Sequence, residues 1–192
     1  MKYDQQEIQE ALELWWNTGN VQEDWGAWAN LYTADAEYVE HFWGTMHGPE
    51  EINIFVQSVM QGVPEMYTVL EWYIIGDDRV ALYVENRRDN PDSEGPAYFD
   101  FPQMTGLWYA GDGLWSREEA FWSVSAARVA SAAYDKAVER SGATPEQRMT
   151  RKHFGNGPTW TQPDRVSVPS WVGGDIPPVR RPSELRALLN AR

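Results

Sequence analysis

Residues 28–52 read Trp28-Ala-Asn-Leu-Tyr-Thr-Ala-Asp-Ala-Glu-Tyr-Val-Glu-His-Phe-Trp-Gly-Thr-Met-His-Gly-Pro-Glu-Glu-Ile52, and three local patterns follow one another within them. The first residues end a helical stretch that we place at residues 22–32, and residues 36–43 switch to a pattern typical of a strand. A turn at residues 44–48 closes that strand. Pro49 fits the first turn of a further helix, residues 49–60, whose positive end carries Glu50 and Glu51.

The residues before this segment predict a first helix at residues 4–17. Its apolar side chains recur at the spacing of one helical face: Ile8, Ala11, Leu12, Trp15 and Trp16. Asp4 and Glu7 indicate a capping box at its start, and residues 17–20 contain the glycine that is typical of a helix stop.

The residues after Pro64 alternate with a period of two and predict four strands, at residues 66–75, 80–88, 97–110 and 114–122. Short glycine-containing turns at residues 76–78 and 111–113 join two of the pairs, and a longer loop lies at residues 90–96. Such short connections predict an antiparallel meander. The Ala-rich residues 123–141 predict a last helix that Gly142 ends.

Composition excludes several classes of protein. The 192 residues contain no cysteine, which excludes a disulfide scaffold, an iron–sulfur cluster, a thiolate zinc site and a Cys nucleophile. The first residues lack the pattern of a signal peptide, and no apolar run approaches the roughly 18 residues of a membrane span, so we expect a cytoplasmic protein. A net charge of −13 argues against a nucleic-acid or membrane partner.

The charge also divides the chain into two parts. Residues 1–141 hold 8 Lys or Arg and 25 Asp or Glu, whereas residues 142–192 hold 8 and 4, together with seven of the twelve prolines. We therefore predict a folded domain at 1–141 and a basic, Pro-rich arm at 142–192, with a short helix at 182–192. The arm should lie on the acidic body, anchored by Trp160 and Trp171 and by arginines such as Arg148, Arg151 and Arg165. A disordered tail and an arm that embraces a second subunit are the alternatives.

The order helix, helix, strand, helix and four strands resembles the nuclear transport factor 2-like superfamily, which includes SnoaL-like polyketide cyclases and ketosteroid isomerase. Residues 28–52 look like the family's helix-two to helix-three signature, and Tyr109-Ala-Gly-Asp-Gly113-Leu-Trp-Ser-Arg-Glu-Glu119 looks like its last hairpin. The resemblance implies an α+β fold in which a cone-shaped, curved antiparallel sheet wraps around helices and encloses an apolar pocket. It also implies a homodimer formed by the outer face of the sheet, and chemistry without a metal or cofactor.

Two catalytic patterns of this superfamily match only in part. The ketosteroid isomerase pattern places its base near Glu40 or His41, but Leu12 and Thr105 stand where its two oxyanion donors are expected. The limonene epoxide hydrolase pattern meets Ala120 where an acid is expected. Neither reaction is therefore assigned from the sequence.

Five residues are the candidate catalytic set. His41 is the candidate base, because histidine is the side chain whose ordinary pKa lies closest to neutral pH. Alternation on the last strand turns either Glu118 or Glu119 inward, and the hairpin match favours Glu118, which burial would make a proton donor. On the strand at 80–88, one face carries Tyr83, Glu85 and Arg87 as donor, partner and anion stabiliser. We expect that face to line the pocket, because Val80, Leu82 and Val84 make a good helix-packing strip; the opposite assignment stays open.

Aromatic residues are the candidate ligand contacts. The candidates for the pocket wall are Trp15, Trp28, Trp43, Trp72 and Trp108, with Asp100 as a further polar contact. The favoured hypothesis is an enzyme that isomerises, cyclises, dehydrates or opens an epoxide in an apolar polycyclic or aromatic metabolite. The alternative is a ligand-binding or dimerisation module without catalysis.

Overall fold

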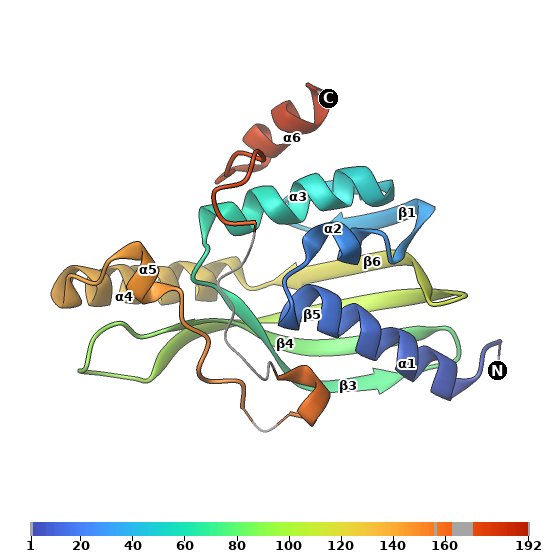
Figure 1. The fold of residues 1–192 in the computed structure, drawn as a ribbon, viewed down its shortest axis with the longest axis horizontal. Coiled ribbons are helices and arrows are strands. Elements are labelled where there is room, and N and C mark those ends of the chain that lie inside the picture. Colours follow the sequence, from blue (N-terminus) through green and yellow to red (C-terminus); the bar gives the residue numbers. More distant parts are fainter. Residues whose placement is uncertain (1, 156, 163–170, 192) are drawn as a thin grey trace.

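A curved sheet of six strands forms the centre of the molecule (Figure 1). The computed structural model describes residues 2–155, 157–162 and 171–191. The strands are β1 (Tyr32–Glu40), β2 (Gly44–His47), β3 (Tyr67–Ile75), β4 (Arg79–Asp89), β5 (Tyr98–Gly111) and β6 (Leu114–Trp122). Their order is β2-β1-β6-β5-β4-β3, with β2 and β3 as free edges, so the sheet is not closed. The predicted α+β class is confirmed, but the sheet is mixed, because β1 pairs with β6 in parallel.

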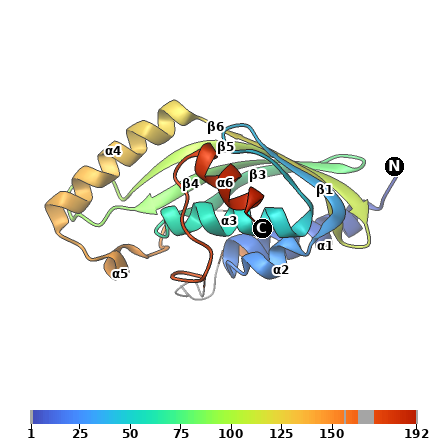
Figure 2. The ribbon, with the colours of Figure 1, turned by 90° about the horizontal axis from the view of Figure 1, so that it is seen from above.

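Three helices lie on the concave face of the sheet (Figures 1 and 2). They are α1 (Gln5–Trp16), α2 (Trp25–Ala29) and α3 (Gly48–Gly62), and their apolar faces share one core with the inward residues of the strands. Within that core the indole of Trp28 contacts the rings of Trp15, Trp25 and Tyr32, with centroids 5.1 to 5.9 Å apart. Trp28 is therefore the centre of an aromatic cluster in the core between the helices and the sheet.

The curvature of the sheet comes from local irregularities in pairing. Register shifts occur on β1 between Tyr32 and Glu37, on β3 between Leu70 and Trp72, and near Tyr109 on β5. An extra residue on one strand bends that strand and increases its twist, which lets the sheet fold around the helices. The turn between β5 and β6 takes positive φ at Gly111, Asp112 and Gly113, which suits its two glycines.

The expected helix at residues 22–32 is much shorter in the structure. The expected stop at residues 17–20 is a π-helical turn, η1 (Asn17–Val21), and α2 begins only at Trp25. The Gly19 backbone lies against the Trp28 indole, where a Cβ would stand 2.5 Å from Cδ1. A side chain at position 19 would therefore collide with the indole, so glycine allows Trp28 to pack against this turn.

The helix that follows the sheet, α4 (Val124–Ser141), lies with α5 (Pro145–Arg148) at the end of the molecule opposite the N terminus (Figures 1 and 2). The αL residue Gly142 ends α4 as predicted. The arm then passes η2 (Thr159–Thr161) and ends in α6 (Pro182–Asn190), which packs on α3.

The prediction that the arm lies on the body is confirmed for the described residues. The Arg151 guanidinium forms a buried ion pair with Glu23 (Nε to Oε1, 2.5 Å), and the Trp171 indole donates to the same carboxylate at 3.2 Å. Trp160 packs edge-on against Tyr73, and Arg148 pairs with Glu65 at 3.3 Å. Arg165 lies outside the described residues. The arm is therefore part of the core and not an appendage.

None of the helices in the described ranges is both long enough and apolar enough to cross a membrane.

Candidate functional site

A cavity of about 920 Å³ lies between the concave face of the sheet and the helices. Its wall is rich in aromatic side chains, among them Trp15, Trp28, Trp43, Phe55, Phe101 and Trp122. Three of the predicted ligand contacts, Trp15, Trp28 and Trp43, thus line this cavity. This is the size and character of a site for a small molecule.

The other two predicted aromatic contacts are wrong. Trp72 stacks on Tyr83 on the convex face, with ring planes at 7° and centroids 5.6 Å apart. Trp108 lies between the guanidinium groups of Arg79 and Arg117 on that same face. Strand alternation points both indoles away from the helices.

The carboxyl group of Glu118 lies at the deep end of the cavity. Its side chain is 2% exposed, and Oε2 accepts a hydrogen bond from the Tyr32 hydroxyl, which in turn accepts one from Trp15 Nε1 at 2.9 Å. Tyr38 also hydrogen-bonds this carboxyl group. Burial raises the pKa of Glu118 to about 7, against the lowering effect of the two tyrosines. Glu118 can therefore hold or release a proton near neutral pH.

A second buried carboxyl group, that of Glu40, lines the same cavity. Its Oε2 accepts from the backbone N–H groups of Phe42 (2.9 Å) and Trp43 (2.5 Å), whereas the buried Oε1 has no partner among the described residues. Burial raises the pKa of Glu40, although the two backbone donors oppose the rise. The charge of Glu40 also raises the pKa of Glu118. The cavity thus holds two acids of unlike environment.

His41, the predicted base, lies outside the cavity. Its side chain is half exposed, with Nε2 2.9 Å from Glu119 Oε1 and its ring against Phe121. Since Glu40 ends β1 facing inward, the next residue faces outward. The same alternation turns Glu119 out and Glu118 in, as the hairpin match favoured.

The predicted cavity face of β4 is also wrong. Tyr83 and Glu85 bond each other on the convex face at 3.1 Å, and Arg87 pairs there with Asp100 at 2.8 Å. Arg87 also donates to the backbone carbonyl of His153 in the arm. The residues that face inward are Leu82, Val84, Asn86 and Arg88. The helices and the cavity share the concave face, so a helix-packing strip is also the cavity wall.

A family model described as the SnoaL-like domain matches residues 8–118. The chain belongs to the SnoaL-like domain family. The matched range contains both buried carboxyl groups and the tyrosines that bond Glu118, whereas the arm lies outside it. No curated protein sequence matches the chain.

Solved structures share the fold at low sequence identity. An epoxide hydrolase from M. tuberculosis, of the limonene epoxide hydrolase-like type, is 14% identical over 70% of this chain and 96% of its own, with a TM-score of 0.55. A protein from Shewanella putrefaciens named for the SnoaL-like polyketide cyclases is 15% identical over 68% and 88%, with a TM-score of 0.54. A SnoaL-like protein of unknown function from Burkholderia thailandensis is 15% identical over 63% and 98%, at 0.50. These similarities establish the SnoaL-like fold alone.

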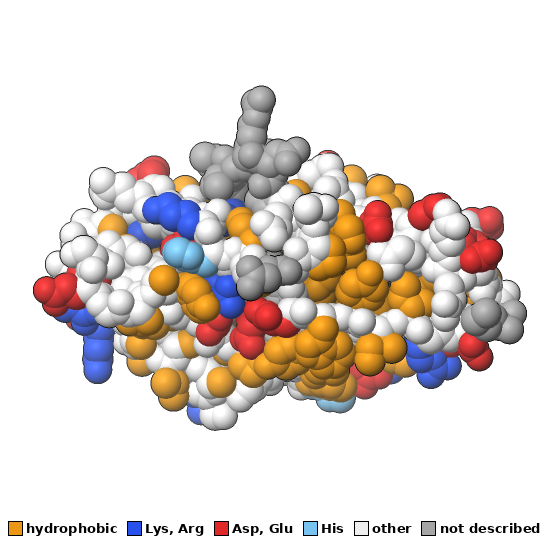
Figure 3. Space-filling model, turned by 90° about the horizontal axis from the view of Figure 1, so that it is seen from below, with side chains coloured by type: hydrophobic (Ala, Val, Ile, Leu, Met, Phe, Trp, Pro, Cys, Tyr) orange, Lys and Arg blue, Asp and Glu red, His pale blue; other side chains and the backbone are white. Residues whose placement is uncertain are grey.

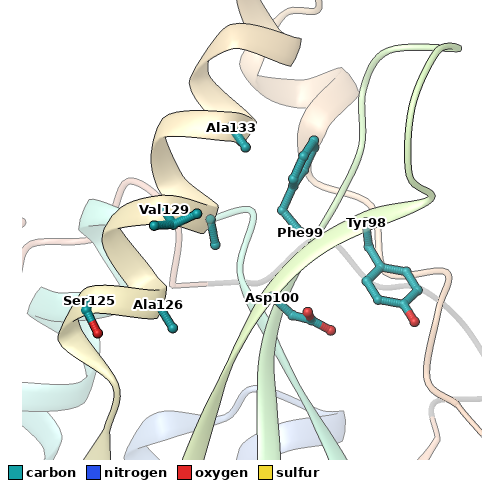
Figure 4. A pocket seen from close by; sticks show the side chains of 8 residues that line it. Tyr98, Phe99, Asp100, Ser125, Ala126, Val129 and Ala133 are labelled. Carbon is teal, nitrogen blue, oxygen red and sulfur yellow. The ribbon is translucent and has the colours of Figure 1, made fainter.

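A second, shallower hollow of about 560 Å³ lies between α4 and β5 (Figure 4). Asp100 lines it together with Tyr98, Phe99 and the α4 residues Ala126 and Val129. Arg87 donates two hydrogen bonds to the Asp100 carboxylate. Asp100, the predicted polar contact of the ligand, does not line the cavity that holds Glu118 and Glu40. Within the described ranges of this SnoaL-like chain, no three His, Asp or Glu side chains gather as a metal site.

Sequence reasoning missed several polar groups that line the cavity, among them Tyr38, Gln103 and Arg88, and also Tyr32, which bonds Glu118. Asn86, Gln103 and Thr105 form a chain of side-chain hydrogen bonds along β4 and β5, each 3.0 Å long. One signal could have found Gln103 and Arg88: once Glu118 is inward, the antiparallel register turns Leu107 inward, and alternation along β5 and then β4 turns Gln103 and Arg88 inward as well.

Proposed function

We propose that this protein is an enzyme that moves protons within an apolar, polycyclic or aromatic metabolite, using Glu118 as general acid and base and no cofactor. The carrying observation is the fully buried Glu118 carboxyl group, with a pKa of about 7, at the deep end of an aromatic cavity. A group that titrates near the working pH can take a proton in one step and return it in the next.

The reaction class follows from balancing the proton. Glu118, as carboxylate, takes a proton from a substrate carbon next to a carbonyl group, and the electron pair moves onto the carbonyl oxygen. The electron pair then returns from the oxygen to carbon. In isomerisation Glu118 delivers the proton to a different carbon; in ring closure the deprotonated carbon attacks a second carbonyl group of the substrate, and Glu118 protonates the alkoxide that forms there. Tyr38 lies beside Glu118 and is the donor placed to stabilise the developing oxyanion.

Glu40 has a supporting role in this proposal. Its unpartnered Oε1 is an acceptor for a substrate hydroxyl or for a water molecule in the cavity. The same pair of acids would suit dehydration or epoxide opening, which need one group to donate a proton and another to accept one.

A binding module without catalysis is the second candidate. It is favoured by the hydrogen bonds from both tyrosines to Glu118, which would satisfy that group without any substrate.

Hydrogen exchange distinguishes the two candidates. The protein is incubated in deuterium oxide with a panel of aromatic and polycyclic ketones and epoxides, and mass spectrometry follows deuterium uptake and conversion. Wild type is expected to act on at least one compound, and Glu118→Gln to slow that step by about 10²-fold or more. Saturable binding without exchange or conversion by wild type would favour the binding module.

Two outer-face variants are the matched controls. Glu119→Gln changes the neighbouring residue of the same type, and His41→Gln removes its partner; both side chains lie outside the cavity. Each should leave the rate within about twofold. An unchanged rate in correctly folded Glu118→Gln would remove Glu118 from the mechanism.

A further inference from the structure

The guanidinium group of Arg88 is buried at the other end of the cavity without an anionic partner. Arg88 is 7% exposed and lines the cavity from β4. Its one hydrogen bond among the described residues runs from Nη2 to Ser131 Oγ of α4 at 2.8 Å, and its guanidinium lies 4.3 Å from the Tyr134 ring centroid. No carboxylate of the described residues lies within 4.0 Å of it. A buried arginine is ordinarily paired, because an unpaired charge costs several kcal/mol to remove from water.

The donors around Arg88 exceed the acceptors. Arginine has five N–H donors, and the structure uses one. The buried Tyr134 hydroxyl and Arg148 Nε, both on residues that line this end of the cavity, also have no partner among the described residues. Such an arrangement fits a ligand group that only accepts hydrogen bonds.

The surrounding charges limit that ligand group to a single negative charge. Arg148 pairs with Glu65 at 3.3 Å, so its charge is largely balanced. Asp135 and Glu65 both act on Arg88 through space. With Glu65 paired to Arg148, Asp135 acts on Arg88 only from beyond ion-pair distance, so Arg88 has room for one direct anionic partner, which matches a carboxylate better than a phosphate dianion.

The position of Arg88 sets the length of the ligand. Through the cross-strand register, Glu118 lies opposite Leu107 and then Val80, eight residues before Arg88 on β4. Eight residues of strand span about 26 Å. Between the two ends the cross-strand register places Leu82 beside Thr105, then Val84 beside Gln103 and Trp122, and then Asn86 beside Phe101, which suits a mostly apolar body with a few polar groups.

We propose that the outer end of the cavity binds the carboxylate of an elongated amphiphilic ligand through Arg88, with Tyr134 and Arg148 as additional donors. The apolar part of this ligand lies along the aromatic wall and points toward Glu118. The inference rests on the proposed function only in naming that ligand as the substrate. The anion site itself is inferred from the buried guanidinium group of Arg88, which has no carboxylate partner among the described residues.

A fluorescent acid and its uncharged counterpart test the proposal without any mutation. The probes are dansyl-labelled undecanoic acid and the corresponding primary amide, titrated against wild type. The acid is expected to bind at least about tenfold more tightly than the amide, because only the acid satisfies Arg88. Equal affinities, or failure of both probes to bind, would overturn the proposal.

Substitutions of Arg88 then test whether this residue causes the tighter binding of the acid. Arg88→Gln should remove most of the acid's advantage and leave the amide's affinity within about twofold, and Arg88→Lys, which keeps the charge, should retain part of it. The matched control is Arg140→Gln, because Arg140 is an exposed arginine of α4 whose one ion pair among the described residues is with Asp92. A full acid preference in folded Arg88→Gln would contradict the assignment. Displacement of the probe more strongly by dodecyl phosphate than by dodecanoate would contradict the choice of carboxylate.

This test and the test of catalysis can fail separately. Glu118→Gln should keep the acid preference, since Glu118 lies at the opposite end of the cavity. Acid preference in a protein that catalyses no exchange would sink the proposed function and leave the anion site standing.

Discussion

At the scale of single residues, the buried carboxyl group of Glu118 makes the stability of the folded protein depend on pH. Its pKa in the folded protein is about 7, against 4.5 as the ordinary value. Between these values the folded state binds more protons than the unfolded state, so stability falls as pH rises through this window and levels off above it. A shift of this size corresponds to a cost on the order of 3 kcal/mol at pH 8. The group proposed to do chemistry is therefore one that weakens the fold.

Replacing Glu118 by Gln should flatten this dependence. Denaturation of wild type and Glu118→Gln from pH 4.5 to 8 is expected to show that the free energy of unfolding of wild type declines relative to the variant as pH rises. Glu119→Gln should instead diverge from wild type only as pH falls below the ordinary value of 4.5, because His41 and Arg117 hold the pKa of Glu119 below that value and wild type loses this stabilisation when Glu119 is protonated. Parallel curves for wild type and Glu118→Gln would show that Glu118 does not titrate in this range.

At the scale of elements, the arm is held to the body by a buried latch. The latch consists of Arg151, Glu23 and Trp171, and both members of its ion pair are 5% exposed. Arg151 also donates to the Pro64 carbonyl, so the latch ties the arm both to the start of α2 and to the loop before β3. Glu23 has φ of 53°, a backbone conformation that non-glycine residues seldom adopt, which the latch helps to hold.

Breaking the latch on one side should destabilise the whole protein. Arg151→Ala leaves the Glu23 carboxylate buried without its partner, and we expect a loss of about 3–5 kcal/mol in chemical denaturation together with faster proteolysis of the arm. Arg140→Ala, which removes an exposed pair, should cost about 0–1 kcal/mol. A loss for Arg151→Ala as small as that of the control would show that the arm adds little to stability.

The elements differ in how far the sequence could predict them. The strands from residue 66 onward were predictable to within a few residues, because their turns and alternation are local signals. The parallel pairing of β1 with β6 was not predictable, because it joins residues about 80 positions apart. For the same reason the sequence did not show that two tyrosines of β1 bond Glu118. Glu118 itself was predictable from one hairpin. Tyr83, Glu85 and Arg87 were assigned to the wrong face, because alternation gives two faces and does not say which one the helices cover.

At the scale of the whole molecule, the convex face of the sheet carries a continuous apolar row. Cross-strand register aligns Trp72, Tyr83, Met104 and Phe121 over four strands. Trp72 is 45% and Phe121 47% exposed, and Ile74, nearby on β3, is 64% exposed. Hydrophobic side chains gather broadly on the underside of the molecule (Figure 3). A monomer in water seldom leaves such a row uncovered.

We therefore keep the prediction of a homodimer through this face. Sedimentation at micromolar concentration should give twice the 22.1 kDa chain mass, and Trp72→Glu combined with Phe121→Lys should give the monomer. Val129→Lys, at an exposed apolar position of α4 away from the row, is the matched control and should remain a dimer. A wild-type protein that sediments as a single chain would refute the prediction.

The arm also bears on when the cavity comes into being during synthesis. Val179 and Arg180 line the cavity, and the Val179 N–H bonds the Ser58 carbonyl of α3 at 2.9 Å. These residues are synthesised after the whole sheet, so a nascent chain whose sheet and helices have already folded still has an open side there. A ligand can be enclosed only once this part of the arm has emerged and docked. A chain cut short before Trp171 would leave the indole of Trp25, which Trp171 contacts, open to chaperones and proteases. Quality control of this protein would then depend on whether its arm has docked.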